Sequence, residues 1–160
     1  MPHIIIEHSS DFSKNSIIIL QKEIQNILAS ITEGNFSADQ CKARSFVFDE
    51  YLVGKPDQET ALFLHITIKI LSGRVLEVRK KAAEKVANFA KDFFEKLLFS
   101  PTEKDELIAL THRIEDVVSG VPHVQFPMQN SKLANKRCDI SVDIVEMDRD
   151  TYQKIRIENN

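Results

Sequence analysis

The sequence predicts an α+β fold of two layers, in which a four-stranded mixed sheet carries two helices on one face. Two observations support this fold. Each half of the chain holds an apolar, β-branched strand followed by a segment with helical spacing and then by a second strand. The corresponding elements of the two halves also have similar spacing, so the fold is a repeated β-α-β unit. A C-terminal β-hairpin is expected to follow the repeat.

The first half begins with residues 1–8, where three consecutive Ile residues predict a short buried strand. The cluster Ser9–Asp11 is expected to start a helix, because such side chains satisfy the free amides of a first turn. Helical spacing of apolar residues then continues to Ile31. Gly34 is expected to end this helix in a left-handed conformation. A second strand is expected from Cys41 to Val53.

The second half is expected to follow the turn Gly54–Asp57, which should join the halves as an antiparallel hairpin. A long strand is predicted from Thr60 to Leu71, a helix from about Arg74 to Leu98, and the fourth strand from Leu107 to Val118. Each β-α-β crossover should leave its two strands parallel. Both helices should then cover the same face of the sheet.

The tail is expected to be separate from the main domain, so that residues 1–137 fold together and residues 138–160 form an extension. Apolar residues alternate near 140–144 and again at 155–157, with a turn-like segment between them, which predicts a hairpin. Because an isolated hairpin is marginally stable in water, it should dock on the body or on a neighbouring subunit. A disordered tail is the alternative.

Composition narrows the classes of function. The net charge of -3 argues against a general nucleic-acid binder. Cys41 and Cys138 are far apart, which favours a reducing compartment and no disulfide framework. No signal peptide or apolar run long enough to span a membrane is apparent, so a cytoplasmic protein without membrane contact is expected. The five His residues lack metal-ligand spacing, so no metal site is expected.

Pro2 is the residue from which a catalytic hypothesis starts. A small second residue such as Pro allows removal of Met1, and Pro2 would then carry a free secondary amine at the mouth of the sheet. An α-amino group titrates near ~7.7–8.0, and a rigid amine that is poised near neutrality is a good general base. The alternative is that the Met-Pro pair has no functional meaning.

Three cations are candidates for binding an anion. Arg74 stands at the start of the second predicted helix, where a cation opposes the helix dipole and is a poor choice for stability alone. The alternative is a surface Arg that pairs with Glu77 or Glu7. Lys42 and Arg44 alternate onto one strand face, which suits a second anionic group, or they line an ordinary solvated edge.

At this point five segments together resemble the 5-carboxymethyl-2-hydroxymuconate isomerase family, of the tautomerase superfamily. The resemblance runs from Met1 to about Arg137, includes Gln125-Phe126 and excludes the tail from Cys138. The segments that carry it are Met1–Glu7, Gly34–Phe36, Cys41–Arg44, Phe63–Ile70 and Ser72–Arg79.

The resemblance implies a repeated β-α-β fold, a homotrimer, and a proton transfer without cofactor in a small anionic dienol dicarboxylate. It implies that Pro2 is the base, that Arg74, Arg44 and Lys42 hold the carboxylates, and that Phe126 lines the pocket, with core packing as the alternative for Phe126. The family has an Arg-x-Arg pair in which Lys42 replaces the first Arg. Lysine keeps the charge but lacks the planar fork that binds a carboxylate twice.

Two considerations remain open at this level. The sheet face without helices would carry Phe63 and other apolar residues, and self-association would cover it, which also predicts a closed homo-oligomer. The alternative function is a non-catalytic binding or assembly module with the same fold, which Lys42 and the added tail favour. The N-terminal residue discriminates between the two, because only a processed chain has a free proline amine.

Overall fold

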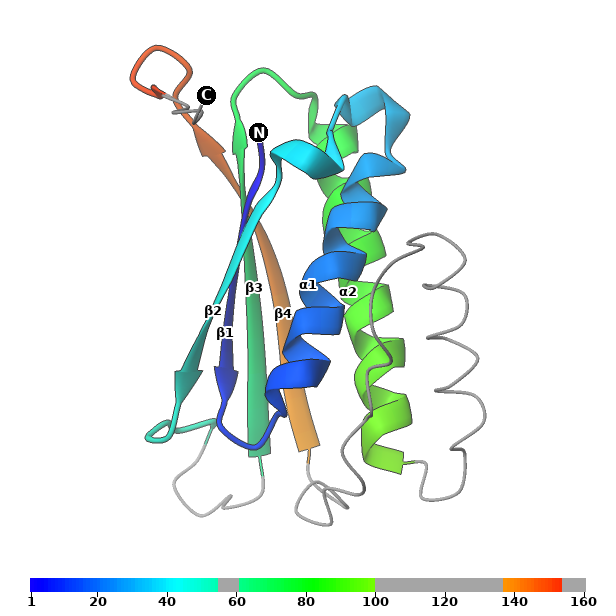
Figure 1. The fold of residues 1–160 in the computed structure, drawn as a ribbon, viewed down its shortest axis with the longest axis vertical. Helices are drawn as coiled ribbons and strands as arrows, with labels where there is room; N and C mark the ends of the chain where they lie inside the picture. The colour runs from blue at the N-terminus through cyan, green and yellow to red at the C-terminus, as the bar shows by residue number, and fades with distance from the viewer. Residues whose placement is uncertain (55–60, 100–136, 154–160) are drawn as a thin grey trace, which may run out of the picture.

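The computed structural model describes residues 1–54, 61–99 and 137–153. These residues form a four-stranded sheet with two helices on one face (Figure 1), which confirms the predicted two-layer α+β fold. None of the described helices is long and apolar enough to cross a membrane. The elements in chain order are β1 (His3–Ser9), α1 (Lys14–Ala29), the short 3-10 helices η1 (Thr32–Gly34) and η2 (Ala38–Gln40), β2 (Lys42–Phe48), β3 (Ala61–Leu71), α2 (Leu76–Phe99) and β4 (Arg137–Met147).

The strand order is β2-β1-β3-β4, with β1 parallel to β2, β1 antiparallel to β3, and β3 parallel to β4. The two β-α-β halves therefore join through their first strands. The prediction that the Gly54–Asp57 turn makes β2 and β3 a hairpin is wrong, because β1 lies between them. Burial explains the order: β1 and β3 hold rows of buried Ile and Leu, whereas most of β2 is exposed and suits an edge.

The fourth strand of the sheet is β4. Its position differs from the prediction that residues 138–160 form an extension separate from the main domain. β4 pairs with β3 from Arg137 opposite Ala61 to Met147 opposite Leu71. The residues expected to open a separate hairpin are thus part of the main sheet. Their alternating apolar side chains pack against the core, which agrees with the expected docking on the body, but they do so as the fourth strand of the sheet. The strand expected at residues 107–118 and the second hairpin strand at 155–157 lie outside the described residues.

The core lies between the sheet and the helices. Every second residue of β1 and β3 is buried there, including Ile4, Ile6, Ile66 and Ile68, as strand periodicity requires. The opposite face, which we call the open face, carries the alternate residues. It holds half-buried side chains from β1 and β3 and exposed ones from β2.

The first helix differs from its prediction at both ends. Its N-cap is Ser13, whose Oγ accepts a 3.1 Å hydrogen bond from the Ser16 N–H, so α1 begins after the predicted cluster. It ends at Ala29, and Gly34 instead closes η1. The left-handed residue that follows is Asn35, with φ of 46°. The reason for glycine at position 34 is space, since a Cβ there would meet the ring of Phe36.

Candidate functional site

Pro2 occupies the entrance to β1. It is buried, and its carbonyl accepts a 3.0 Å hydrogen bond from the Lys42 N–H, which extends the β1–β2 pairing by one step. A proline fits here because no strand hydrogen bond is needed from its nitrogen. In the structure Met1 precedes it, so the Pro2 nitrogen is part of a peptide bond. The buried Ile4 and Ile6 behind it hold the entrance in place.

The open face beside Pro2 carries a group of cationic side chains. In register, His3 lies between Lys42 of β2 and Lys69 of β3, and Arg44 lies beside Ile5. Residues in register across a sheet point to the same face, so Lys42 and Arg44 share the open face with His3. The pKa of His3 is lowered, first by burial and then by Arg44, Lys42, the N-terminal amine and Lys69. The entrance of β1 is therefore strongly electropositive.

Arg74 lies in the loop between β3 and α2 and has well-defined partners. Its Nε donates to the Gly34 carbonyl at 2.9 Å, and its Nη1 donates to the Leu71 carbonyl at 2.8 Å. The guanidinium carbon lies 4.6 Å from the ring centroid of Phe36, which is a cation–π contact. None of the ion pairs among the described residues involves Arg74, so the surface pairing with Glu77 or Glu7 is not found.

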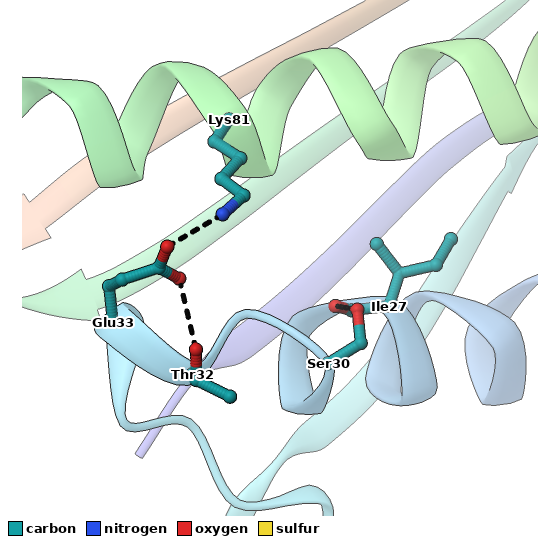
Figure 2. A network of polar contacts seen from close by, with 5 residues as sticks. All are labelled: Ile27, Ser30, Thr32, Glu33 and Lys81. Atoms are coloured by element: carbon teal, nitrogen blue, oxygen red, sulfur yellow. Dashed lines mark hydrogen bonds and ion pairs between the residues drawn. The ribbon is translucent and has the colours of Figure 1, made fainter.

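The loop that receives Arg74 is also held by an ion pair. Lys81 reaches from α2 to Glu33 of η1, with Nζ 2.8 Å from Oε1 (Figure 2). This contact with Lys81 lowers the pKa of Glu33 to about 2. Glu33 and Gly34 are neighbours, so two cations on the β3–α2 side fix the η1 loop. The ion pair therefore helps to hold the Gly34 carbonyl in the position where it accepts the hydrogen bond from Arg74.

Two residues of the turn after β4 reach the same end of the sheet, and the sequence did not identify either. Arg149 Nε donates to the Ser72 carbonyl at 2.6 Å. The Tyr152 hydroxyl lies 3.1 Å from His3 Nε2 and 3.8 Å from the sulfur of Met1, and the Tyr152 and His3 rings meet edge to face at 5.9 Å. The turn itself was predicted and is confirmed by a 2.9 Å bond from the Asp150 N–H to Asp148 Oδ1.

The structure thus places the predicted residues that it describes at one end of the sheet but in two groups. Pro2, Lys42 and Arg44 gather at the entrance of β1. Arg74 lies at the end of β3 on the side of the core residue Phe36. The turn after β4 contacts both groups, through Tyr152 and Arg149. Phe126 lies outside the described residues.

Metal binding and nucleophilic cysteine chemistry are the other candidates, and the described residues support neither. Among the described residues, no group of three or more His, Cys, Asp and Glu side chains could hold a metal ion. Burial raises the pKa of Cys41, and burial with the neighbouring Asp139 raises the pKa of Cys138 to about 12. Both residues are therefore thiols at neutral pH, which is the poorly nucleophilic form.

Comparison with known proteins decides the family. A family model described as 5-carboxymethyl-2-hydroxymuconate isomerase matches residues 2–121 of the chain. The chain belongs to this isomerase family. The match begins at Pro2, covers Lys42, Arg44 and Arg74, and ends before Phe126 and before the turn that follows β4. The resemblance found in the sequence is thereby confirmed.

Solved structures share the fold of this family member. A 5-carboxymethyl-2-hydroxymuconate isomerase from Deinococcus radiodurans R1 is 18% identical, with a TM-score of 0.65 over 99% of this chain and 90% of that chain. A 5-carboxymethyl-2-hydroxymuconate delta-isomerase is 14% identical, with a TM-score of 0.62 over 98% and 88%. A fused 4-OT protein, described as an asymmetric trimer, is 6% identical, with a TM-score of 0.55 over 95% and 91%. No curated protein sequence matches this chain.

Proposed function

We propose that this family member is a cofactor-independent isomerase that moves a proton within a dienol dicarboxylate of the 2-hydroxymuconate type. In this proposal Met1 is removed and the free Pro2 nitrogen is the base. The observation that carries the proposal is the position of Pro2. It is the first residue of the family match, and burial and the bond from the Lys42 N–H hold it at the entrance of β1.

The electrostatics of this entrance support a base. His3, Lys42, Arg44 and Lys69 lie around the start of β1, and burial together with these cations lowers the pKa of His3. Positive charge nearby favours the neutral form of an amine, which is the form that accepts a proton. A fixed, neutral secondary amine satisfies both requirements for general base catalysis, position and protonation state.

The proposed reaction needs no other reactant. The Pro2 nitrogen takes the proton from the 2-hydroxyl of the dienol, so the O–H bond breaks and a dienolate forms. The electron pair moves along the conjugated carbons, and the ammonium of Pro2 returns the proton to a carbon, which gives the 2-oxo isomer. The intermediate carries negative charge on oxygen, and cations fixed nearby lower its free energy.

The carboxylates would be bound by two groups of cations. Arg44 and Lys42 project from the open face beside Pro2, and Arg74 lies at the end of β3. Arg44 can bind a carboxylate through two parallel hydrogen bonds, whereas Lys42 supplies a point charge. Two separate groups favour a dicarboxylate over a monocarboxylate. Phe126 stays a proposed lining residue of the pocket.

We also propose that the chain forms a homotrimer through its open face. The face carries exposed aromatic residues, with Phe46 and Phe48 exposed by 49% and 39%, next to Phe63 and Tyr51. Self-association would remove this apolar surface from water. A relative with this fold is described as a trimer, which supports the same assembly here. The two free cysteines fit a reducing compartment such as the cytoplasm.

A non-catalytic binding or assembly module is the second candidate. Lys42 favours it, because an ammonium lacks the planar fork with which an arginine at this position would hold a carboxylate. Intact-mass spectrometry of the protein from cells decides the N-terminal residue. A chain that retains Met1 quantitatively would support the module and contradict the isomerase.

Steady-state kinetics test the isomerase directly. The processed wild type should isomerise a dienol dicarboxylate, followed by the loss of dienol absorbance. Pro2→Ala replaces the secondary amine with a primary one and should lower kcat/KM by about 100-fold or more, the usual contribution of a general base. Lys91→Ala is the matched control, because the ion pair of Lys91 among the described residues is with the exposed Glu95 on α2, and its kinetics should equal those of the wild type. Equal kinetics for Pro2→Ala would overturn the assignment of the base.

A further inference from the structure

The turn at residues 148–152 is the feature of the candidate site that the family match does not cover, since the match ends at residue 121. One end of the turn contacts the β3–α2 loop through Arg149, and the other contacts His3 through Tyr152. Tyr152 follows Arg149 by three positions, so their Cα atoms lie within about 11 Å of each other. The turn therefore spans the space between the entrance of β1 and the end of β3.

Arg149 is docked closely on the loop that carries Arg74. Its Nε donates to the Ser72 carbonyl at 2.6 Å, and the Ser72 N–H donates in turn to the Met147 carbonyl at 2.9 Å. The guanidinium lies over Gly73, since a Cβ at that position would be 3.7 Å from both Nε and Nη2 of Arg149. Gly73 has φ of 96°, a left-handed conformation that favours glycine. The loop is thus shaped so that Arg149 can lie against it.

Two guanidinium groups lie on this loop, and within residues 1–54, 61–99 and 137–153 neither forms an ion pair. The Arg149 guanidinium lies against Gly73, the residue before Arg74, and burial followed by the charge of Arg149 lowers the pKa of Arg74. Asp148 and Asp150 belong to the same turn, but Asp148 Oδ1 accepts the Asp150 N–H. Two cations on one loop without an acidic partner in the described part of the chain are poor for stability and suit an anionic ligand.

Arg74 and Arg149 also have N–H donors that are available to a ligand. The bonds of Arg74 to protein use Nε and Nη1, and the bond of Arg149 uses Nε. Within the described part of the chain, no hydrogen bond uses Nη2 of Arg74 or either Nη of Arg149. These N–H groups are fixed by the carbonyls that hold the remainder of each guanidinium. Donors held in this way lose little entropy on binding.

We infer that Arg149 and Arg74 together bind one carboxylate of the substrate, so that the turn after β4 is part of the active site. This inference rests on the proposed function and adds a binding residue from outside the family match. The second carboxylate is left to Arg44 and Lys42 across the entrance of β1. The arrangement requires a dicarboxylate, because each group of cations then holds one end.

Binding of adipate, an unreactive six-carbon dicarboxylate, tests the inference without turnover. Isothermal titration should give a dissociation constant about tenfold or more weaker for Arg149→Gln than for the wild type. Arg149→Lys should fall between the two, since it keeps one charge and one donor but not the fork. Arg137→Gln is the matched control, because Arg137 lies at the opposite end of β4 with Asp139, and its affinity should be unchanged.

The outcomes separate this inference from the proposed function. Unchanged adipate affinity in Arg149→Gln, or no adipate binding by the wild type, would overturn the inference. Circular dichroism and the intermediate affinity of Arg149→Lys show whether a loss reflects the missing charge or a disturbed turn, and equal loss in both variants would also contradict it. The processed wild type could bind adipate through Arg149 and yet fail to isomerise dienols. That result would overturn the proposed function but would support the dicarboxylate site.

Discussion

Arg74 Nε lies 2.9 Å from the carbonyl oxygen of Gly34, a residue 40 positions earlier in the chain. The same guanidinium binds the Leu71 carbonyl at the end of β3 and stacks on Phe36. Arg74 therefore joins the η1 loop to the start of α2. A cation placed before a helix opposes the helix dipole, and these carbonyls offset that cost.

Arg74→Lys should destabilise the fold, because one ammonium cannot reach both carbonyls with the geometry of a guanidinium. We expect the free energy of unfolding to fall by about 1.5–3 kcal/mol, the usual value for a hydrogen bond to a charged group. Urea unfolding measures it. Arg79→Ala is the control: it removes the partly exposed pair with Glu146, the ion pair of Arg79 among the described residues, and should cost about 1 kcal/mol or less. If Arg74→Lys and Arg79→Ala lose the same unfolding free energy, the two carbonyl contacts of Arg74 stabilise the fold no more than an exposed ion pair does.

Arg74→Ala should also change substrate selectivity. If Arg74 holds a carboxylate, kcat/KM should fall more for a dienol dicarboxylate than for the matching monocarboxylate. Steady-state kinetics with both substrates measure the ratio. An equal fall for both would show that Arg74 acts only on the structure of the loop.

Gly34→Ala should be destabilising for steric reasons. The new Cβ would collide with the ring of Phe36, and overpacking of this kind costs about 1–3 kcal/mol. Thermal or urea unfolding measures the loss. Phe36→Leu removes the ring with which the new Cβ collides. The double variant should therefore lose less unfolding free energy than the sum of the losses in the two single variants. Full additivity would place the cause elsewhere than in the Gly34–Phe36 contact.

His3 reports the positive field at the entrance of β1. Burial, Arg44 and Lys42 hold its pKa below the ordinary value of 6.5, so the unfolded chain binds the proton more readily than the folded chain does. This residue therefore costs stability as the pH falls through 6.5 toward the lowered pKa, and costs nothing above 6.5. Arg44→Gln should raise the pKa of His3, measured by NMR titration of the ring. Lys91→Gln, on α2, should leave it unchanged, and the same pKa in Arg44→Gln would contradict the proposed field.

Phe46 tests the proposed trimer. Sedimentation of the wild type should give three times the mass of the chain. Phe46→Glu would place a charge in a buried interface and should shift the protein to the monomer at micromolar concentration. Leu52→Glu, at an exposed residue outside the strands, is a control for added charge. A monomeric wild type would contradict the assembly.

Much of the fold follows from local pattern. Four elements were predicted from a clear local pattern. The pattern is the Ile run in β1, the alternation of apolar residues in β3, and the helical spacing in α1 and α2. Pairing partners were harder, because the sequence shows which strands are apolar but not which edge each one meets. β4 illustrates this: its alternation was recognised, but its pairing with β3 depends on the tertiary contacts of Ile140 and Ile144.

The candidate site was predictable where residues belong to one strand or one family motif. Lys42 and Arg44 share a face because strands alternate, and Pro2 is the first residue of the family match. Arg149 and Tyr152 were missed because their role depends on docking between segments more than 70 residues apart in sequence. The end of β4 fixes the turn that carries them, so the misassigned strand also hid these two residues.

The central claim is that the free nitrogen of Pro2 is the base, and one comparison tests it most directly. The rate of isomerisation of a dienol dicarboxylate should be measured for the chain that begins at Pro2 and for the same chain made without methionine aminopeptidase, which keeps Met1. Retained Met1 turns the nitrogen into an amide that cannot accept a proton, so kcat/KM should fall by about 100-fold or more while circular dichroism stays the same. Equal rates for the two chains would contradict the account.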